Sequence, residues 1–229
     1  LSLLFSNYFQ GMKFFIDTAN LAQIQEAQDL GIIDGVTTNP SLMAREGIKG
    51  DVNIKQHYID ICNIVDGDVS AEVIAADFEG IIKEGEELAK LHPQIVVKAP
   101  MIKEGIKAIK YFSNKGIKTN CTLVFSTGQA LLAAKAGATY VSPFIGRLDD
   151  IGESGIDVVA QICHIYKIHG FETQVLAASI RSQEHIIQCA EAGADVVTTP
   201  LAPILELLKH DLTDKGLAKF LEDHANNNS

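Results

Sequence analysis

The sequence has no long hydrophobic run, no closely spaced cysteine pair and no excess of basic residues, and each absence excludes a class of protein. No apolar stretch approaches the roughly 20 residues that a transmembrane helix needs. Lys and Arg number 19 against 29 Asp and Glu, so the formal net charge is -10, and neither nucleic acid nor an anionic membrane is an expected partner. An anionic metabolite remains compatible with this charge if a few arginines converge on one cleft.

The sequence also lacks the usual motifs for metals and nucleotide cofactors. The seven histidines show no zinc-binding spacing, and no strand is followed by G-x-G-x-x-G or G-x-x-x-x-G-K-[ST]. We therefore expect neither a metal nor a cofactor. Cys62, Cys121, Cys163 and Cys189 are widely spaced, which is typical of free thiols in a reducing compartment, so we expect a cytoplasmic protein.

A pattern of strand followed by helix repeats about eight times along the chain. Candidate strands lie at Phe14–Thr18, Gly35–Thr38, Val69–Ile74, Ile95–Ala99, Lys118–Val124, Tyr140–Phe144, Gln174–Ser179 and Val196–Thr199. Candidate helices lie at Leu21–Leu30, Phe78–Leu91, Ile102–Lys115, Thr127–Ala136, Ile156–His169, Ser182–Ala192 and Pro203–His210. This repetition predicts an α/β protein with a single (β/α)8 TIM barrel and an additional C-terminal helix at about residues 213–225. An open doubly wound sheet is the alternative, but it often carries the glycine-rich loop that is missing here.

The first eleven residues do not fit the pattern. Asn7-Tyr8-Phe9-Gln10-Gly11 resembles the remnant of an engineered protease-cleavage linker, and Met12 looks like a natural start. We expect residues 1–11 to be a tag remnant and residues 12–229 to form the single barrel domain.

The stretch Ile95-Val96-Val97-Lys98-Ala99-Pro100 combines a buried strand with a lysine near its end. The β-branched run predicts a strand buried on both faces, and Pro100 cannot donate to a sheet, so the strand should stop there. Lys98 shares a face with Val96 because side chains alternate along a strand. A buried lysine can be a neutral amine that forms a Schiff base with a carbonyl substrate, whereas the ordinary alternative is a lysine that extends to solvent.

Polar side chains recur at the carboxyl ends of the other strands, the face on which barrel enzymes hold their active sites. Each has an ordinary explanation as a cap, a turn residue or a solvated charge, but chance would not place five or more of them at the same end of neighbouring strands. The strand-end and following loop residues are Asp17, Asn39, Glu72, Asn120, Thr122, Ser142, Phe144, Arg147, Ser179 and Arg181.

These side chains match the needs of imine chemistry. Dehydration of a carbinolamine needs an acid/base group and a held water, which Glu72 and Thr122 could supply. Cleavage of the carbon–carbon bond beside the imine needs a base for the departing hydroxyl, and Asp17 is the candidate. The protonated imine on Lys98 would be the electron sink.

Other strand-end residues suit a phosphorylated sugar. Asn39 and Asn120 can hydrogen-bond sugar hydroxyls, and Arg147 and Arg181, together with Ser179, can bind a phosphate, because planar guanidinium groups suit oxyanions.

The sequence resembles the transaldolase family, and in particular its short-chain branch. The matching motifs are spread in order over the whole chain after residue 11. They are Ile16-Asp17-Thr18-Ala19, Gly35-Val36-Thr37-Thr38-Asn39-Pro40-Ser41, Val97-Lys98-Ala99-Pro100, Thr119-Asn120-Cys121-Thr122, Ser142-Pro143-Phe144-Ile145-Gly146-Arg147 and Ala178-Ser179-Ile180-Arg181. The resemblance implies a (β/α)8 barrel that transfers a dihydroxyacetone unit from a ketose phosphate to an aldose phosphate in the pentose phosphate pathway, without a metal.

The resemblance also implies roles for individual residues. The Schiff-base lysine of the family matches Lys98, its proton-transferring aspartate Asp17, its acid/base glutamate Glu72 and its water-holding threonine Thr122. Its substrate-binding residues match Asn39, Asn120, Ser142, Phe144, Arg147, Ser179 and Arg181. The resemblance further implies a ring-shaped homo-oligomer, a pentamer or a decamer, in which the C-terminal helix reaches a neighbour.

Two other functions remain open at this stage. Fructose-6-phosphate aldolase resembles the same pattern but releases free dihydroxyacetone. Phe144 and Glu72 resemble the residues of the transferase at these positions, where the aldolase has tyrosine and glutamine instead. A barrel that binds a phosphosugar without turnover is a candidate from another class, although it would not need the complete set of nucleophile, acid and base.

Overall fold

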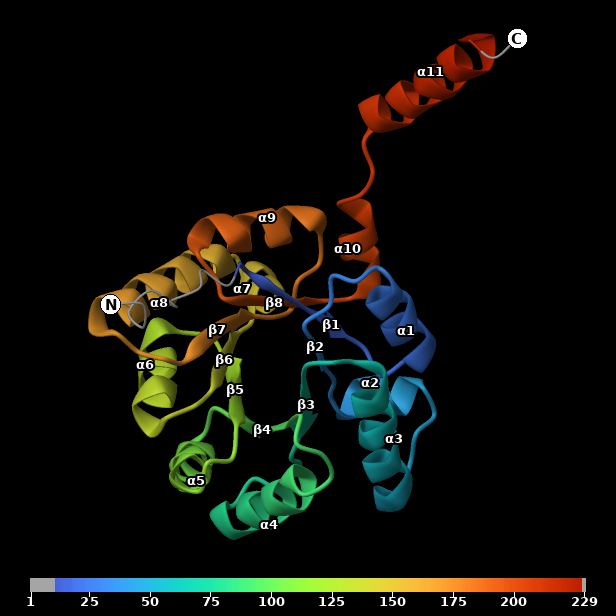
Figure 1. Ribbon diagram of the computed structural model, residues 1–229. Coiled ribbons are helices and arrows are strands. Elements are labelled where there is room, and N and C mark those ends of the chain that lie inside the picture. The colour runs from blue at the N-terminus through green and yellow to red at the C-terminus, as the bar shows by residue number, and fades with distance from the viewer. Residues whose placement is uncertain (1–10, 228–229) are drawn as a thin grey trace, which may run out of the picture.

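The structure, a computed structural model, describes residues 11–227. Eight parallel strands form a closed barrel in which each strand pairs with the next and β8 pairs with β1, and helices surround it (Figure 1). The strands are β1 Lys13–Asp17, β2 Gly35–Thr37, β3 Asp68–Glu72, β4 Ile95–Pro100, β5 Thr119–Val124, β6 Tyr140–Pro143, β7 Gln174–Ala177 and β8 Val196–Thr199. The predicted (β/α)8 barrel is therefore confirmed, and the open doubly wound sheet is wrong. Ten of the eleven residues predicted to be a tag remnant lie outside the described residues.

The helices cover the outside of the barrel. They are α1 Leu21–Asp29, α2 Pro40–Arg45, α3 Asp51–Ile64, α4 Phe78–Ala89, α5 Lys103–Asn114, α6 Thr127–Ala136, α7 Ile145–Asp149, α8 Gly155–His169, α9 Gln183–Ala192, α10 Leu201–Glu206 and α11 Asp211–Asn227. Apolar side chains on their inner faces and on the outer faces of the strands form the larger of two hydrophobic clusters.

Three helices were missed by the sequence analysis, and one was misplaced. α2 follows Asn39, whose side chain caps it, and α7 has five residues, so both are too short to show a periodic pattern. α3 buries only a narrow face, with Tyr58, Ile61 and Cys62, so its hydrophobic periodicity is weak. α10 spans Leu201–Glu206 and not the predicted 203–210.

The barrel interior is filled in layers that alternate with the period of two expected for strands. The lower layer belongs to the smaller hydrophobic cluster, and its rings Phe15 and Tyr140 pack edge to face with centroids 5.9 Å apart. On four strands the residue two positions further along lines a polar cavity. The pairs are Phe15 and Asp17 on β1, Val96 and Lys98 on β4, Tyr140 and Ser142 on β6, and Val196 and Thr198 on β8.

Gly35 completes the lower layer by having no side chain. A Cβ atom at this position would lie 2.6 Å from Cζ of Phe15 and 2.5 Å from the carbonyl oxygen of Asp68. The phenylalanine ring therefore takes the space that a side chain on β2 would otherwise fill. The layer below the cavity is formed mainly by large apolar groups, and the polar groups that line the cavity lie above it, toward the carboxyl ends of the strands.

α11 differs from the other helices because it buries none of its residues. It projects away from the barrel (Figure 1). Its apolar side chains Leu212, Leu217, Phe220 and Leu221 are between 58% and 73% exposed. Among residues 11–227, no helix has the length and apolarity needed to cross a lipid bilayer.

Candidate active site

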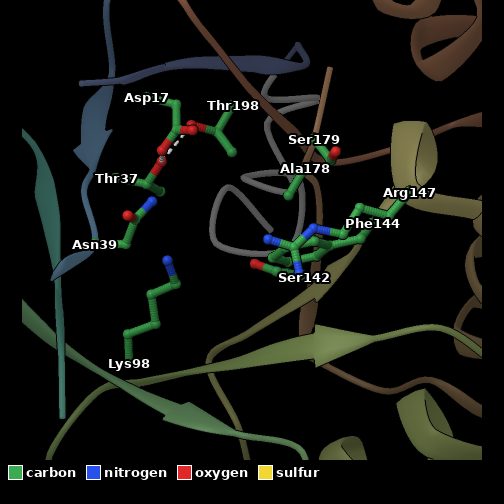
Figure 2. A pocket seen from close by; sticks show the side chains of 10 residues that line it. All are labelled: Asp17, Thr37, Asn39, Lys98, Ser142, Phe144, Arg147, Ala178, Ser179 and Thr198. Atoms are coloured by element: carbon green, nitrogen blue, oxygen red, sulfur yellow. Dashed lines mark hydrogen bonds between the residues drawn. The ribbon is translucent and has the colours of Figure 1, made fainter. Parts of the chain in front are cut away.

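Two adjoining hollows lie at the carboxyl ends of the strands. The first, called the central cavity here, has a volume of about 130 Å³ and is shown in Figure 2. It is lined by Asp17, Thr37, Asn39, Lys98, Ser142, Phe144, Arg147, Ala178, Ser179 and Thr198. The second, called the outer opening, has a volume of about 420 Å³ and shares Asp17, Asn39, Lys98, Phe144 and Arg147 with the first. Glu72, Thr122, Leu123 and Arg45 are among the residues that line only the outer opening.

Lys98 is buried at the end of β4, with 6% of the residue exposed. Its Nζ atom lies 3.1 Å from Oε2 of Glu72 and donates a hydrogen bond of 3.2 Å to the carbonyl oxygen of Thr38. Glu72 reaches it from β3, where the two residues are in register. The lysine does not extend to solvent, so the ordinary interpretation of this residue is wrong. A buried amine held between an acid and a carbonyl is suited to nucleophilic attack.

Asp17 lies across the central cavity from Lys98 (Figure 2). Thr37 donates a hydrogen bond of 2.7 Å to Oδ1 of Asp17. Burial raises the pKa of Asp17, and the Lys98 ammonium, the Thr37 hydrogen bond and the Arg45 guanidinium offset this rise only in part. A carboxyl group with a raised pKa holds a proton more readily than an ordinary one, which suits a group that must both accept and return a proton.

A chain of hydrogen bonds crosses the barrel interior between β6 and β3. Ser142 donates to Oδ1 of Asn120 over 2.8 Å, and Nδ2 of Asn120 donates to Ser70 over 3.1 Å. Both ends of the Asn120 amide are therefore occupied by the protein. Of this chain, Ser142 lines the central cavity.

Thr122 has a buried hydroxyl without a hydrogen-bond partner among the described residues. It lines the outer opening together with Lys98 and Glu72. A buried hydroxyl of this kind needs a partner, and a water or a substrate hydroxyl in the opening would supply one. The next residue, Leu123, has φ 60°, and the pairing of β5 with β6 shifts in register here.

The oxygen and the nitrogen of the Asn39 amide have different roles. Its Oδ1 accepts a hydrogen bond of 3.0 Å from the backbone N–H of Leu42 and so caps α2. Its Nδ2 is left to donate into the central cavity, which Asn39 lines.

Positive charge lies on the opposite side of the central cavity. The Arg147 guanidinium stacks over the ring of Phe144, with Cζ 5.0 Å from the ring centroid, and both line the two hollows. Ser179 lines the central cavity with φ 59°, a left-handed backbone that ends β7 two residues before the predicted strand end. An anion bound here would meet both a guanidinium and a hydroxyl.

Arg181, like Asn120, is a predicted site residue that lines neither hollow. Both of its terminal nitrogens bind the carboxylate of Asp150, one contact being 2.5 Å from Nη2 to Oδ2. Its side chain runs past Gly146, where an added Cβ would lie 2.6 Å from Nε. The guanidinium thus lies beside the phosphate-suited region and is held by an acidic residue.

Several lining residues were not among the predicted site residues, and Thr37, Thr198 and Arg45 are three of them. Thr37 was named only within a motif of the family resemblance, and Thr198 could have been found by the period of two from Val196. Arg45 lines the outer opening from α2. No pattern in the chain pointed to Arg45, because α2 itself was missed.

The described part of the chain offers neither an activated cysteine thiol nor a metal-binding cluster as an alternative reactive site. All four cysteines are free, and burial raises the pKa of Cys121, Cys163 and Cys189 to about 12. Within residues 11–227, no three His, Cys, Asp or Glu side chains come together as a metal-binding group. The site can therefore be described as a buried amine, flanked by two carboxyl groups, with hydroxyls and amides around it and arginines at one side.

Comparison with known proteins matches residues 14–228 to the family model described as transaldolase/fructose-6-phosphate aldolase. A relative from Phocaeicola vulgatus is 73% identical over 213 residues, which cover 93% of this chain and 98% of the relative. One from Cytophaga hutchinsonii is 71% identical over the same shares. Both are named "Probable transaldolase".

A solved structure from Coccidioides immitis shares the fold. It is described as a candidate fructose-1,6-biphosphate aldolase and matches with a TM-score of 0.57 and 14% identity, over 83% of this chain and 74% of that chain. At this identity the likeness extends to the barrel architecture only.

Proposed function

We propose that this chain, which belongs to the transaldolase/fructose-6-phosphate aldolase family, is a transaldolase. It transfers a dihydroxyacetone unit from sedoheptulose 7-phosphate to glyceraldehyde 3-phosphate, giving erythrose 4-phosphate and fructose 6-phosphate in the pentose phosphate pathway, and it also runs in reverse. The observation that carries the proposal is the buried Lys98 amine, held 3.1 Å from Glu72 and facing Asp17 across one cavity.

The first half of the reaction joins the ketose to the enzyme. The Lys98 ammonium passes a proton to Glu72, and the amine then attacks the carbonyl carbon and forms a carbinolamine, whose hydroxyl leaves as water after taking a proton. In this proposal Glu72, which lies 3.1 Å from Lys98, gives that proton, and Thr122, which lines the outer opening, holds the water. The product of this half is an iminium ion on Nζ of Lys98.

The second half moves the carbon fragment. Asp17 accepts the proton of the hydroxyl next to the breaking bond, the carbon–carbon bond cleaves, and its electron pair passes into the iminium to give an enamine. The aldose phosphate leaves, and the acceptor aldehyde takes its place. The enamine attacks the acceptor carbonyl, Asp17 returns the proton to the new hydroxyl, and water releases the ketose from Lys98.

The remaining predicted residues bind the substrate in this proposal. Asn39 donates to a hydroxyl from its Nδ2, and Ser142 lines the cavity while Asn120, whose amide bonds Ser142 and Ser70, holds Ser142 in position. Arg147 and Ser179 bind the phosphate from the cavity wall, and Phe144 supports the Arg147 guanidinium. Arg181 joins them through the N–H donors that its ion pair with Asp150 leaves unused, because a guanidinium has five donors and the carboxylate occupies two.

The test is an assay that separates transfer from simple cleavage. Purified protein is incubated with fructose 6-phosphate, with and without erythrose 4-phosphate, and glyceraldehyde 3-phosphate and dihydroxyacetone are both measured. We expect sustained glyceraldehyde 3-phosphate only with the acceptor. Sustained dihydroxyacetone without acceptor would identify a fructose-6-phosphate aldolase, and ligand binding without turnover of any sugar phosphate would identify a binding barrel.

A ring-shaped homo-oligomer, a pentamer or a decamer, is part of the proposal. It is supported by α11, whose apolar side chains have no cover on the described chain, because a second copy of this chain would give them a partner. The four free thiols fit a reducing compartment, and we place the enzyme in the cytoplasm.

Phe220→Glu is expected to reduce the size of the assembly, because it puts a charge into the apolar face of α11. Light scattering should give a mass of several chains for the parent and a smaller one for the variant. Glu222→Gln, on the same helix, is the control and should keep the parent mass. An unchanged mass in Phe220→Glu would show that α11 does not hold the assembly together.

A further inference from the structure

We propose that Thr198 on β8 is a positioning residue for the acid/base group Asp17 and acts on it through the hydroxyl of Thr37. The proposal rests on the proposed function, because it assigns Asp17 the proton transfer at the breaking bond. Thr198 lies on the last strand, outside every motif that the sequence analysis singled out.

Three side chains on three neighbouring strands, β8, β2 and β1, form a line of hydrogen bonds, in which β1 pairs with both of the others. Oγ1 of Thr198 lies 2.6 Å from Oγ1 of Thr37, which lies 2.7 Å from Oδ1 of Asp17 (Figure 2). The two threonines are 3% and 2% exposed, and all three residues line the central cavity. The short hydroxyl contact is therefore sheltered from bulk water. Hydrogen bonds are electrostatically stronger in such a buried setting than in water.

Counting protons fixes the direction of this line. An ionised carboxylate can only accept, and each threonine hydroxyl has one proton to give. When Asp17 is ionised, Thr37 gives its proton to Asp17, so the contact between the hydroxyls can be made only if Thr198 donates to Thr37. When Asp17 is protonated, the line can reverse, and the Thr198 proton then turns into the cavity.

This order makes Thr198 a stabiliser of the ionised form. Its donated proton orients and polarises the Thr37 hydroxyl, which strengthens the hydrogen bond to the carboxylate. The charged groups that act on Asp17 are Lys98 from β4 and Arg45 from α2, both of which favour the anion. Thr198 carries no charge, so removing its hydroxyl should change the acidity of Asp17 and leave both cations in place.

The test compares three single variants. Thr198→Val removes the hydroxyl at nearly constant shape, and Thr198→Ser keeps it. Thr199→Val is the matched control, because Thr199 is the next residue of β8, is 0% exposed, and has a hydroxyl without a hydrogen-bond partner among the described residues. The readout is the pH profile of kcat/KM for transfer from fructose 6-phosphate, together with the rate at which borohydride traps the substrate on Lys98.

Asp17 must be ionised to accept the proton, so activity rises as pH rises through its pKa. In Thr198→Val we expect this acid limb to move to higher pH by about 0.5 to 1 unit, which is a loss of about three- to tenfold below the limb. The plateau at higher pH and the trapping rate should stay near those of the parent. Thr198→Ser should show the pH profile of the parent, and the control Thr199→Val should show the same profile.

A double variant tests that Thr198 acts through Thr37. Thr37→Val should shift the limb further than Thr198→Val, and adding Thr198→Val to it should shift the limb no more. Additive shifts, an unmoved limb in Thr198→Val, or no rescue by serine would each overturn the inference. If the parent protein transfers no dihydroxyacetone unit, the proposed function itself fails, which is a different result from a parent that turns over with an insensitive limb.

Discussion

Replacing Lys98 by methionine is expected to lower the transfer rate by about 10⁴-fold or more, because the reaction then has no amine to join to the ketose. Methionine is close to lysine in length and fills the same volume, so the barrel should remain folded. The charge of Glu72 loses its partner at 3.1 Å, and some loss of stability accompanies the loss of activity.

Borohydride trapping gives this expectation a chemical readout. In the parent, reduction in the presence of fructose 6-phosphate should add the mass of one bound sugar fragment to the peptide that contains Lys98. The control is Lys118→Met at the opposite end of the barrel, where Lys118 pairs with Asp68 over 2.7 Å. Lys118→Met should keep both turnover and trapping. Label on a different lysine, or turnover in Lys98→Met, would disprove the assignment.

Asp17→Asn is expected to lower kcat by about 10² to 10⁴-fold while the protein becomes more stable. The amide cannot accept the hydroxyl proton, so cleavage stops, but Lys98 can still form the imine. The variant should therefore accumulate trapped ketose that it fails to release as product. A parent-like kcat in Asp17→Asn would remove Asp17 from the mechanism.

The gain in stability follows from the direction of the pKa. Burial raises the pKa of Asp17, so in the folded chain the carboxyl group holds its proton to a higher pH than in the unfolded chain. The unfolded state then binds fewer protons, and the free energy of unfolding falls as pH rises from the ordinary carboxyl value through the raised one. A neutral amide at this position does not titrate, so it avoids this loss of stability. The variant should unfold at a higher temperature at neutral pH, with the advantage vanishing in acid.

Thermal unfolding of the two proteins between pH 4 and pH 8 measures this difference. A gain of about 1 kcal/mol corresponds to about 2–4 °C for a chain of this size. Asp195→Asn is the control for activity, because burial also raises the pKa of Asp195, but this residue lies outside both hollows of the site. Its turnover should stay within about twofold of the parent.

The barrel could be predicted because each of its strands carries a strong local pattern. Alternation of β-branched runs with amphipathic stretches needs no knowledge of distant contacts, and it located all eight strands. The placement of Lys98 in the cavity followed from the period of two after Val96. The helices α2 and α7 could not be found in this way, since they are set by a cap and by the ends of neighbouring strands.

The site was predicted less completely, because it depends on which side chains meet across strands. The sequence identified Lys98, Asp17 and Glu72 as neighbours, and the structure brings them around the same two hollows. It did not reveal that Asp150 holds Arg181, since a surface ion pair between loops leaves no periodic trace. Nor did it reveal the hydroxyl contact of Thr198, which requires β8 to close against β1 and bring two threonines to 2.6 Å.

The apolar layer beneath the cavity has a consequence for the order of events. Phe15, Val96, Tyr140 and Val196 are at most 3% exposed and seal the barrel below the reacting groups. Substrates can therefore enter and leave the cavity only from the carboxyl ends of the strands. In the proposed mechanism, the first aldehyde departs before the second enters, and Lys98 holds the three-carbon fragment in the interval between them. Because the barrel is closed below the cavity, the departing and the entering aldehyde must use the same opening, one after the other.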